Sequence, residues 1–129
     1  MIYKKNWKYT LYKDESSYCT IFNYYKLKAL KEFGNVKEGD AGGYVRGYHN
    51  LSQFGDCWIY DDSIVFGFAE VSGNAQVKYD SKVFEYARIS DDARIMRSII
   101  SGDAKISGST CCDGARIPRK DGKSDLLSI

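Results

Sequence analysis

A branched apolar residue recurs at every sixth position of this chain between residues 71 and 95: Val71, Val77, Val83, Ile89 and Ile95. A small residue stands two positions before each of them: Ala69, Ala75, Ser81, Ala87 and Ala93. Units of this kind predict short strands joined by corners, and three such units make one triangular coil. The branched side chains are then expected to point inward and to stack on their counterparts in the next coil. The small side chains are expected to fill the corners.

The same phase extends from Cys57 to Cys112 with one irregularity, and Ala115-Arg116-Ile117 looks like a last unit. Ile100 follows Ile95 by five residues instead of six, so a tightened corner or bulge near residues 97–99 is expected to absorb the difference. Before Cys57 the spacing fails, because Gln53 would have to point inward. The sequence therefore predicts an all-β fold, a single-stranded parallel β-helix of about three coils over residues 57–117.

An uncovered coil would expose its backbone edge and its core, so the N-terminal residues are expected to form a cap. Two strand patterns, residues 7–12 and 18–30, predict a β-hairpin, although residues 27–30 could instead form a helical turn. We expect one domain with three parts: N-terminal capping strands over residues 1–40, the β-helix over residues 41–117, and a C-terminal tail over residues 118–129. The apolar residues at the end of the tail could fold back over the last coil or meet another subunit.

The charge balance and the hydropathy of the chain limit the kinds of partner that it can bind. The chain holds 19 Lys and Arg against 17 Asp and Glu, a net charge of +2, with no strongly basic segment. This balance argues against a protein held to nucleic acid by phosphate contacts. No apolar run approaches the ~20 residues of a membrane span, and no signal-peptide pattern follows Met1. We therefore expect a cytoplasmic protein without a membrane contact.

The stretch KLKALKEFGNVKEGDAGGYVRGYHNLSQFGDCWIYDDS resembles the N-terminal signature of YdcK-like β-helix proteins. The matching positions are Phe33-Gly34, Val36, Gly39-Asp40, Gly42-Gly43, Asn50-Leu51-Ser52, Gly55 and Cys57-Trp58-Ile59-Tyr60. Ala41 and Gly47 depart from that pattern, and the resemblance covers roughly residues 20–117. These are small solenoid proteins common in phages and bacterial mobile elements, often described as hexapeptide-repeat transferases. The resemblance implies a parallel, left-handed β-helix.

Little in the sequence predicts catalysis. Hexapeptide acyltransferases use a histidine as general base at a cleft between subunits, and His49 is the only histidine of this chain. It precedes the recognisable repeats, and no long loop follows it. The four cysteines lack the CxxC spacing of a zinc site. The sequence thus predicts a protein that is not an enzyme, with no catalytic, cofactor-binding or metal site.

The outward faces carry the remaining functional prediction. An eighteen-residue offset aligns Phe66 with Phe84 and Phe68 with Tyr86, and exposed aromatic side chains of this kind often mark a docking surface. The candidate partner-binding residues are Phe66, Phe68, Phe84, Tyr86, Trp58 and Tyr60. The expected function is non-catalytic binding of a host protein, as by a phage-encoded, anti-CRISPR-like inhibitor, or of a second copy in a homodimer. The alternatives are a hexapeptide-type acyltransferase, a structural or assembly protein, and simple stabilisation of the coils by these aromatic residues.

Overall fold

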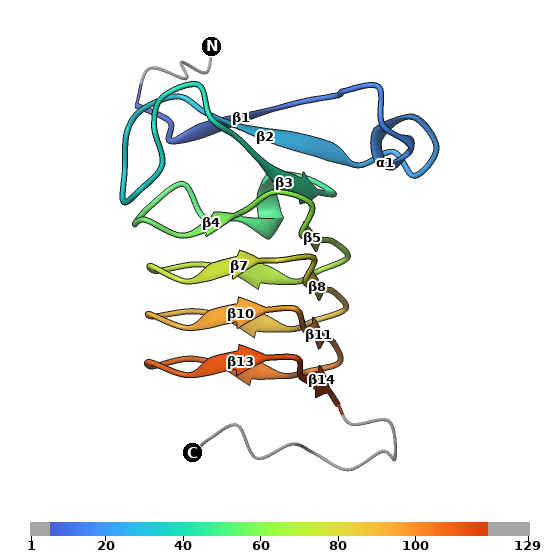
Figure 1. Ribbon diagram of the computed structural model, residues 1–129, viewed down its shortest axis with the longest axis vertical. Helices are drawn as coiled ribbons and strands as arrows, with labels where there is room; N and C mark the ends of the chain where they lie inside the picture. Colours follow the sequence, from blue (N-terminus) through green and yellow to red (C-terminus); the bar gives the residue numbers. More distant parts are fainter. Residues whose placement is uncertain (1–5, 119–129) are drawn as a thin grey trace.

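The computed structural model describes residues 6–118, so all of the predicted tail over residues 118–129 except Pro118 lies outside the described part. A triangular column of stacked parallel strands carries a small antiparallel sheet at its N-terminal end (Figure 1). The predicted all-β class and the parallel β-helix are both confirmed. Among residues 6–118, no helix is long and apolar enough to cross a membrane.

The cap comprises β1 (Tyr9–Tyr12), α1 (Ser17–Thr20), β2 (Tyr25–Ala29) and β3 (Ala41–Val45), and the short 3-10 helix η1 (Tyr48–Asn50) follows it. The column continues with β4 (Trp58–Ile59), β5 (Ile64–Val65), β6 (Glu70–Val71), β7 (Gln76–Lys78) and β8 (Lys82–Val83). The remaining strands are β9 (Arg88–Ile89), β10 (Arg94–Met96), β11 (Ile99–Ile100), β12 (Lys105–Ile106), β13 (Cys111–Asp113) and β14 (Arg116–Ile117).

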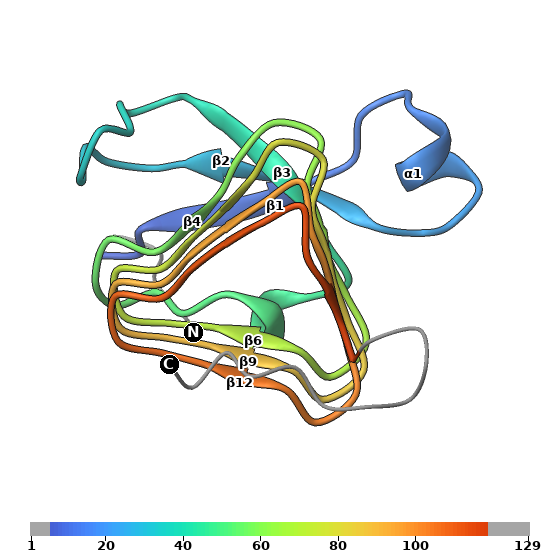
Figure 2. The same cartoon turned by 60° about the horizontal axis from the view of Figure 1, so that its bottom comes forward.

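Every third strand of the column joins the same face. One face stacks β5, β8, β11 and β14, the second β4, β7, β10 and β13, and the third β6, β9 and β12. From the C-terminal end, the chain runs clockwise from β12 through β13 to β14 while it approaches the viewer (Figure 2). The column is therefore left-handed, as the family resemblance implies.

The column makes about four turns rather than the three expected, because its first turn lacks the sixfold spacing. Leu51 occupies the inward position above Val71 and forms a parallel bridge with it, although twenty residues separate the two. Gln53, which the eighteen-residue register would have turned inward, instead accepts a hydrogen bond from the backbone N–H of Lys8 at 2.8 Å. The sixfold spacing does not reveal this turn before Cys57, because contacts with the cap set its register.

The branched residues form the core, as predicted. Val71, Val77, Val83, Ile89 and Ile95 are each at most 1% exposed. Val77 stands in register with Ile95, and Val71 with Ile89, so each apolar side chain contacts its counterpart one turn away. Burying a side chain of this size contributes roughly 1.5–3 kcal/mol. The stack therefore supplies most of the apolar stabilisation of the column.

The corners need small residues and left-handed backbone angles. Ala87 and Ala93 are fully buried there. Gly73 has a φ of +65°, and a Cβ on it would lie 2.8 Å from the backbone nitrogen of Asp91 one turn below. A side chain at that position would therefore have to displace the neighbouring coil.

The irregular spacing after Ile95 is absorbed at one corner, where the sequence places it. Tyr79 and Asp80 both have a φ of +59° at this corner, whereas in the next coil Arg97 turns alone with a φ of +50°. The Arg97 guanidinium pairs with the Asp113 carboxylate through two hydrogen bonds, of 2.7 and 2.5 Å. The register after Arg97 is seventeen residues, as the pairing of Ile99 with Lys82 shows.

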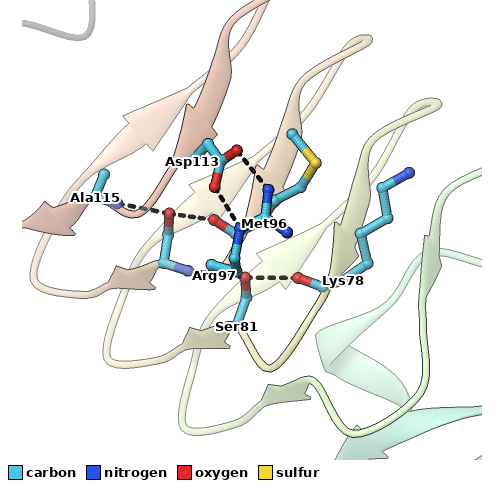
Figure 3. A network of polar contacts seen from close by, with 7 residues as sticks. Lys78, Ser81, Met96, Arg97, Asp113 and Ala115 are labelled. Carbon is cyan, nitrogen blue, oxygen red and sulfur yellow. Dashed lines mark hydrogen bonds and ion pairs between the residues drawn. The ribbon is translucent and has the colours of Figure 1, made fainter.

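A column of buried serines holds the inside of this corner (Figure 3). The Ser81 hydroxyl donates to the Lys78 carbonyl at 2.8 Å and accepts from the backbone N–H of Ser98 at 3.1 Å. The Ser98 hydroxyl donates to the Met96 carbonyl and accepts from the Ala115 N–H in the same way. Polar residues are tolerated here because each hydroxyl satisfies two backbone groups.

The cap sheet continues one face of the column. β1 pairs antiparallel with β2, β2 antiparallel with β3, and β3 parallel with β5. The second predicted strand, over residues 18–30, is too long. Its first residues form α1, which overhangs the column (Figure 2), and the buried Cys19 packs there against Tyr44 and Ile64. Residues 27–29, considered also as a helical turn, belong to β2.

Lys8 donates hydrogen bonds to backbone carbonyls that a preceding coil would otherwise have paired. Its Nζ donates to the carbonyl of Cys57 at 2.8 Å and to that of Gly55 at 3.2 Å, and lies 3.3 Å from the Cys57 Sγ. The Lys8 residue is only 1% exposed. A buried carbonyl without a donor costs about 1–3 kcal/mol. The lysine therefore closes the open end of the column.

Candidate functional site

The turn that carries His49 is tied to the coil below it by Asn50. The Asn50 Oδ1 accepts from the backbone N–H groups of Arg46 and Gly47, at 2.9 and 3.1 Å. Its Nδ2 donates to the carbonyls of Gly67 and Ala69, at 3.2 and 2.8 Å. Asn50 is fully buried, so these contacts fix η1 on the column rather than leaving it as a free loop.

His49 points to the solvent from this fixed turn. Its Nε2 lies 2.8 Å from the carbonyl oxygen of Gly67. A carbonyl oxygen can only accept, so in this contact Nε2 carries the hydrogen. In the neutral ring Nδ1 then holds the lone pair, and this nitrogen can take a proton from another molecule. The backbone of the first coil thereby orients an imidazole that can act as a base.

A hollow of about 230 Å³ opens beside the ring. Its lining comes from η1, the segment after it, and β6 in the coil below: Tyr48, His49, Leu51, Ser52, Gln53, Phe54, Glu70, Val71 and Ser72. Leu51 and Val71 form the apolar floor, because both belong to the buried core. Glu70 is the only carboxylate in the lining, so the hollow carries a local negative charge.

Two exposed aromatic side chains border the hollow. Tyr48 is 40% exposed and Phe54 is 84% exposed. The Tyr48 ring lies 5.2 Å from the Trp7 ring and 5.7 Å from that of Tyr9, and its hydroxyl lies 3.2 Å from the Thr10 Oγ1. The cap therefore holds one aromatic wall in place. Phe54 belongs to the corner before Cys57 and presents most of its surface to solvent.

The four residues predicted as an aromatic ladder do stack in pairs. The Phe66 and Phe84 rings lie 4.9 Å apart, and those of Phe68 and Tyr86 lie 5.2 Å apart, each pair nearly parallel. Phe68 and Tyr86 are 64% and 59% exposed, whereas Phe66 is half-buried beside Tyr24 of the cap. The cap thus covers the upper part of this face and leaves the corner pair open.

Trp58 and Tyr60 occupy different surroundings from those expected. Trp58 is only 1% exposed, between the Phe33 ring at 5.2 Å and the Tyr9 ring at 6.2 Å. The expectation of an exposed Trp58 is corrected: Trp58 lies on the outward side of the coil, in register with Gln76, but the cap folds over it. Tyr60 is half-buried and donates to the Asn35 Oδ1 at 2.7 Å. Neither side chain forms an open docking surface with the other four.

Two larger pockets lie beyond the Phe54–Asp56 corner. One, of about 790 Å³, is mostly apolar and touches Trp7, Lys8, Phe33 and Phe54. The other, of about 610 Å³, is mostly polar and runs along the corner formed by Asp56, Asn74 and Asp92.

Cys57 lies under the cap beside Lys8. Burial raises the pKa of its thiol against the opposing effect of Lys8, so the sulfur stays protonated at neutral pH. Cys57 is therefore a core residue rather than a nucleophile. Among residues 6–118, no cluster of three His, Cys, Asp or Glu side chains could hold a metal ion.

The hollow has no signal in the repeat pattern, because the sixfold spacing does not extend before Cys57. The eighteen-residue register would place Glu70 beside Ser52, whereas Leu51 pairs with Val71 at an offset of twenty residues. The exposed Tyr48 and Phe54 have no such signal either, since their positions depend on the cap.

Known proteins supply a second line of information. No protein-family model matches the chain. A curated protein of Escherichia coli (strain K12), named Uncharacterized acetyltransferase YdcK, is 39% identical over 77 residues. The chain is thus similar to an acetyltransferase. The match covers 59% of this chain and 24% of that protein, so the chain spans about a quarter of the length of its relative.

This similarity corrects one prediction and supports others in part. The expectation that the chain is not an enzyme is wrong, because the curated relative is named as an acetyltransferase. The resemblance to YdcK-like proteins and to hexapeptide-repeat solenoids is supported by the match and by the fold. Nothing in the match supports a phage or mobile-element class, or an anti-CRISPR-like inhibitor.

Proposed function

We propose that this chain catalyses acyl transfer, of an acetyl group from a thioester donor such as acetyl-CoA, with His49 as the general base. The single observation that carries the proposal is the orientation of His49. The Gly67 carbonyl accepts the hydrogen of Nε2 and leaves the lone pair on Nδ1, and His49 is one of the residues that line the hollow. The named activity of the relative supports the choice of an acetyl group.

The proposed reaction follows from these positions. His49 Nδ1 takes a proton from the acceptor, and the freed lone pair attacks the thioester carbonyl carbon. The carbon–sulfur bond then breaks, and the imidazolium returns its proton to the departing thiolate. General base catalysis of this kind typically contributes 10²–10⁴-fold to a rate.

A direct assay tests the proposal. The purified chain is incubated with acetyl-CoA and a panel of small amines and alcohols, and thiol release is followed. We expect release that depends on an acceptor and falls at least about 100-fold in His49→Gln. Gln76→Ala, on another face of the column, is the matched control and should keep the wild-type rate. Absence of transfer to every acceptor, or an unchanged rate in His49→Gln, would overturn the proposal.

The exposed corner pair favours a second candidate function, protein binding. Phe68 and Tyr86 present a stacked apolar edge that an isolated protein usually covers. We propose this pair as the contact for a protein partner or for a second copy of the chain. Interface energy commonly concentrates in a few aromatic residues of this type.

Size-exclusion chromatography with light scattering tests the self-association form of this candidate. Wild-type protein should have a mass larger than that of a monomer. The double variant Phe68→Asp with Tyr86→Asp should have the mass of a monomer, and its circular dichroism spectrum should show that it is folded. Phe54→Asp, on a different corner, is the control and should leave the mass unchanged. A monomeric wild type would exclude the second copy and direct the search to another protein.

A further inference from the structure

We infer that the acceptor taken by the His49 hollow is a small primary amine, bound as its ammonium ion by Glu70 between Tyr48 and Phe54. This inference rests on the proposed acyl transfer and adds the chemical class of the acceptor.

The charge of the lining is the first argument. Glu70 is the only carboxylate among the residues that border the hollow, and the lining holds no Lys or Arg. The Glu70 residue is exposed, and among residues 6–118 no hydrogen bond or ion pair engages its carboxylate. Arg88 stands directly beside Glu70 in the parallel register but forms no ion pair with it. A cationic ligand would give this carboxylate its missing partner.

The aromatic rims are the second argument. Tyr48 and Phe54 both border the hollow and are 40% and 84% exposed. An ammonium group near the face of an aromatic ring gains about 0.5–1 kcal/mol at exposed sites, and more where water is excluded. An alcohol gains nothing comparable from either the carboxylate or the rings. The hollow therefore favours an amine over the equally sized alcohol.

The volume is the third argument. At about 230 Å³ the hollow is smaller than the ~300–1,000 Å³ of pockets that take drug-sized ligands. It suits a short alkylamine or the amine end of a longer molecule. Leu51 and Val71 are each 1% exposed and close the floor, so the exposed rings of Tyr48 and Phe54 offer the apolar contact for a short alkyl stem.

The chemistry balances without any further reactant. The bound ammonium gives one proton to His49 Nδ1, and the amine so formed attacks the thioester carbonyl. The carbon–nitrogen bond forms, the carbon–sulfur bond breaks, and the thiolate takes the proton from the imidazolium. The amide nitrogen releases its second proton to solvent. One ammonium and one thioester thus give one amide, one thiol and one proton.

The test compares n-butylamine with n-butanol as acceptors, because the two have nearly the same shape. We expect transfer to the amine, with a KM that rises at least tenfold in Glu70→Gln and falls in Arg88→Gln, where the neighbouring positive charge is removed. Glu38→Gln, an exposed carboxylate of the cap, is the matched control and should leave this KM unchanged. Transfer to butanol with no transfer to butylamine would keep the proposed function and overturn the amine assignment.

A binding measurement separates this inference from the proposed function. Titration of the apo protein with n-butylammonium at low ionic strength should shift the NMR resonances of His49 and Glu70, and Glu70→Gln should abolish the shift. Such binding without any acetyl transfer would support the amine site and overturn acyl transfer. Absence of a Glu70-dependent shift would overturn the amine site, whatever acceptors the protein uses.

Discussion

The column and the cap of this protein are stabilised in different ways. In the column each core position repeats one turn away, so Val77 meets Ile95 and Val71 meets Ile89 through the same contact. In the cap the decisive contacts occur once: Lys8 satisfies the carbonyls of Gly55 and Cys57, and Asn50 ties η1 to the first coil. A repeating contact can be lost from one turn and survive in the others. A unique contact has no substitute.

The proposed site lies where these two regions meet. His49 and Tyr48 belong to the turn between them, whereas Glu70 belongs to the column. Under the proposed function, the coils below the site act as a scaffold, and the residues at the junction of cap and column carry out the chemistry. The loss of a unique contact should therefore have a larger effect than the loss of one copy of a repeated contact.

Removing the cap should have the largest effect. A variant lacking residues 1–40 exposes Cys57, Trp58 and the backbone edge of the first turn, so we expect aggregation instead of a cooperative fold. A variant lacking residues 88–104, one seventeen-residue turn, joins Ala87 to Lys105 in register and should fold with one turn fewer. Circular dichroism and chromatography distinguish the two. A soluble, folded protein without residues 1–40 would show that the column needs no cap.

Ala87→Leu should come next in effect. Ala87 is fully buried at a corner, and overpacking a core typically costs ~1–3 kcal/mol. Arg88→Leu changes the adjacent outward residue, where substitutions usually stay within ~0.5 kcal/mol. The measurement is the free energy of unfolding in urea for both variants. Equal values would mean that the inward register has been assigned wrongly.

Lys8→Met should destabilise the protein by about 2 kcal/mol, because the apolar stem remains but the buried Cys57 carbonyl and the Gly55 carbonyl lose their donor. The expected loss is large for one side chain, since no repeat of this contact exists elsewhere. Lys82→Met, an exposed lysine of the column, is the control and should be nearly neutral. A Lys8→Met protein as stable as the wild type would remove the distinction between unique and repeated contacts.

The smallest predicted effect depends on pH. Burial raises the pKa of Tyr44 to about 12, and its hydroxyl donates to the Asp14 carboxylate at 2.9 Å. The stability from this group is complete below its ordinary pKa of 10.0 and is lost as the pH rises toward 12. Tyr44→Phe should therefore show a shallower fall of the unfolding free energy between pH 10 and 12. It will not abolish the fall, because burial also raises the pKa of Tyr9. An equal fall in both proteins would show that Tyr44 does not contribute.

The repeating part of the fold could be predicted from the sequence, and the junction could not. Val71 and Ile95 reveal their burial through spacing alone, and the shortened corner at Arg97 follows from one missing residue. Leu51 escapes the same reasoning because its distance to Val71 is set by how β3 enters the column. The burial of Trp58 depends on Phe33 and Tyr9, which cover it and are distant in sequence.

The candidate site follows the same division. His49 is visible as the only histidine, but its value as a base depends on the Gly67 carbonyl eighteen residues away. Glu70 sits in a regular strand, but its place beneath that segment depends on the twenty-residue offset between Leu51 and Val71, which the repeat does not predict. Tyr48 borders the hollow because it packs against the cap, and Phe54 borders it from the neighbouring corner. No periodicity in the sequence indicates either position.

The central claim is that the junction performs the chemistry and the lower coils support it. Acetyl transfer from acetyl-CoA to n-butylamine, measured side by side for the variant lacking residues 88–104 and for His49→Gln, tests this most directly. Per folded molecule, the shortened protein should retain most of the wild-type rate, because His49, Glu70 and the cap are all present. His49→Gln, with every coil intact, should lose at least about 100-fold. A shortened but folded protein that loses transfer, beside a His49→Gln protein that keeps it, would contradict the account.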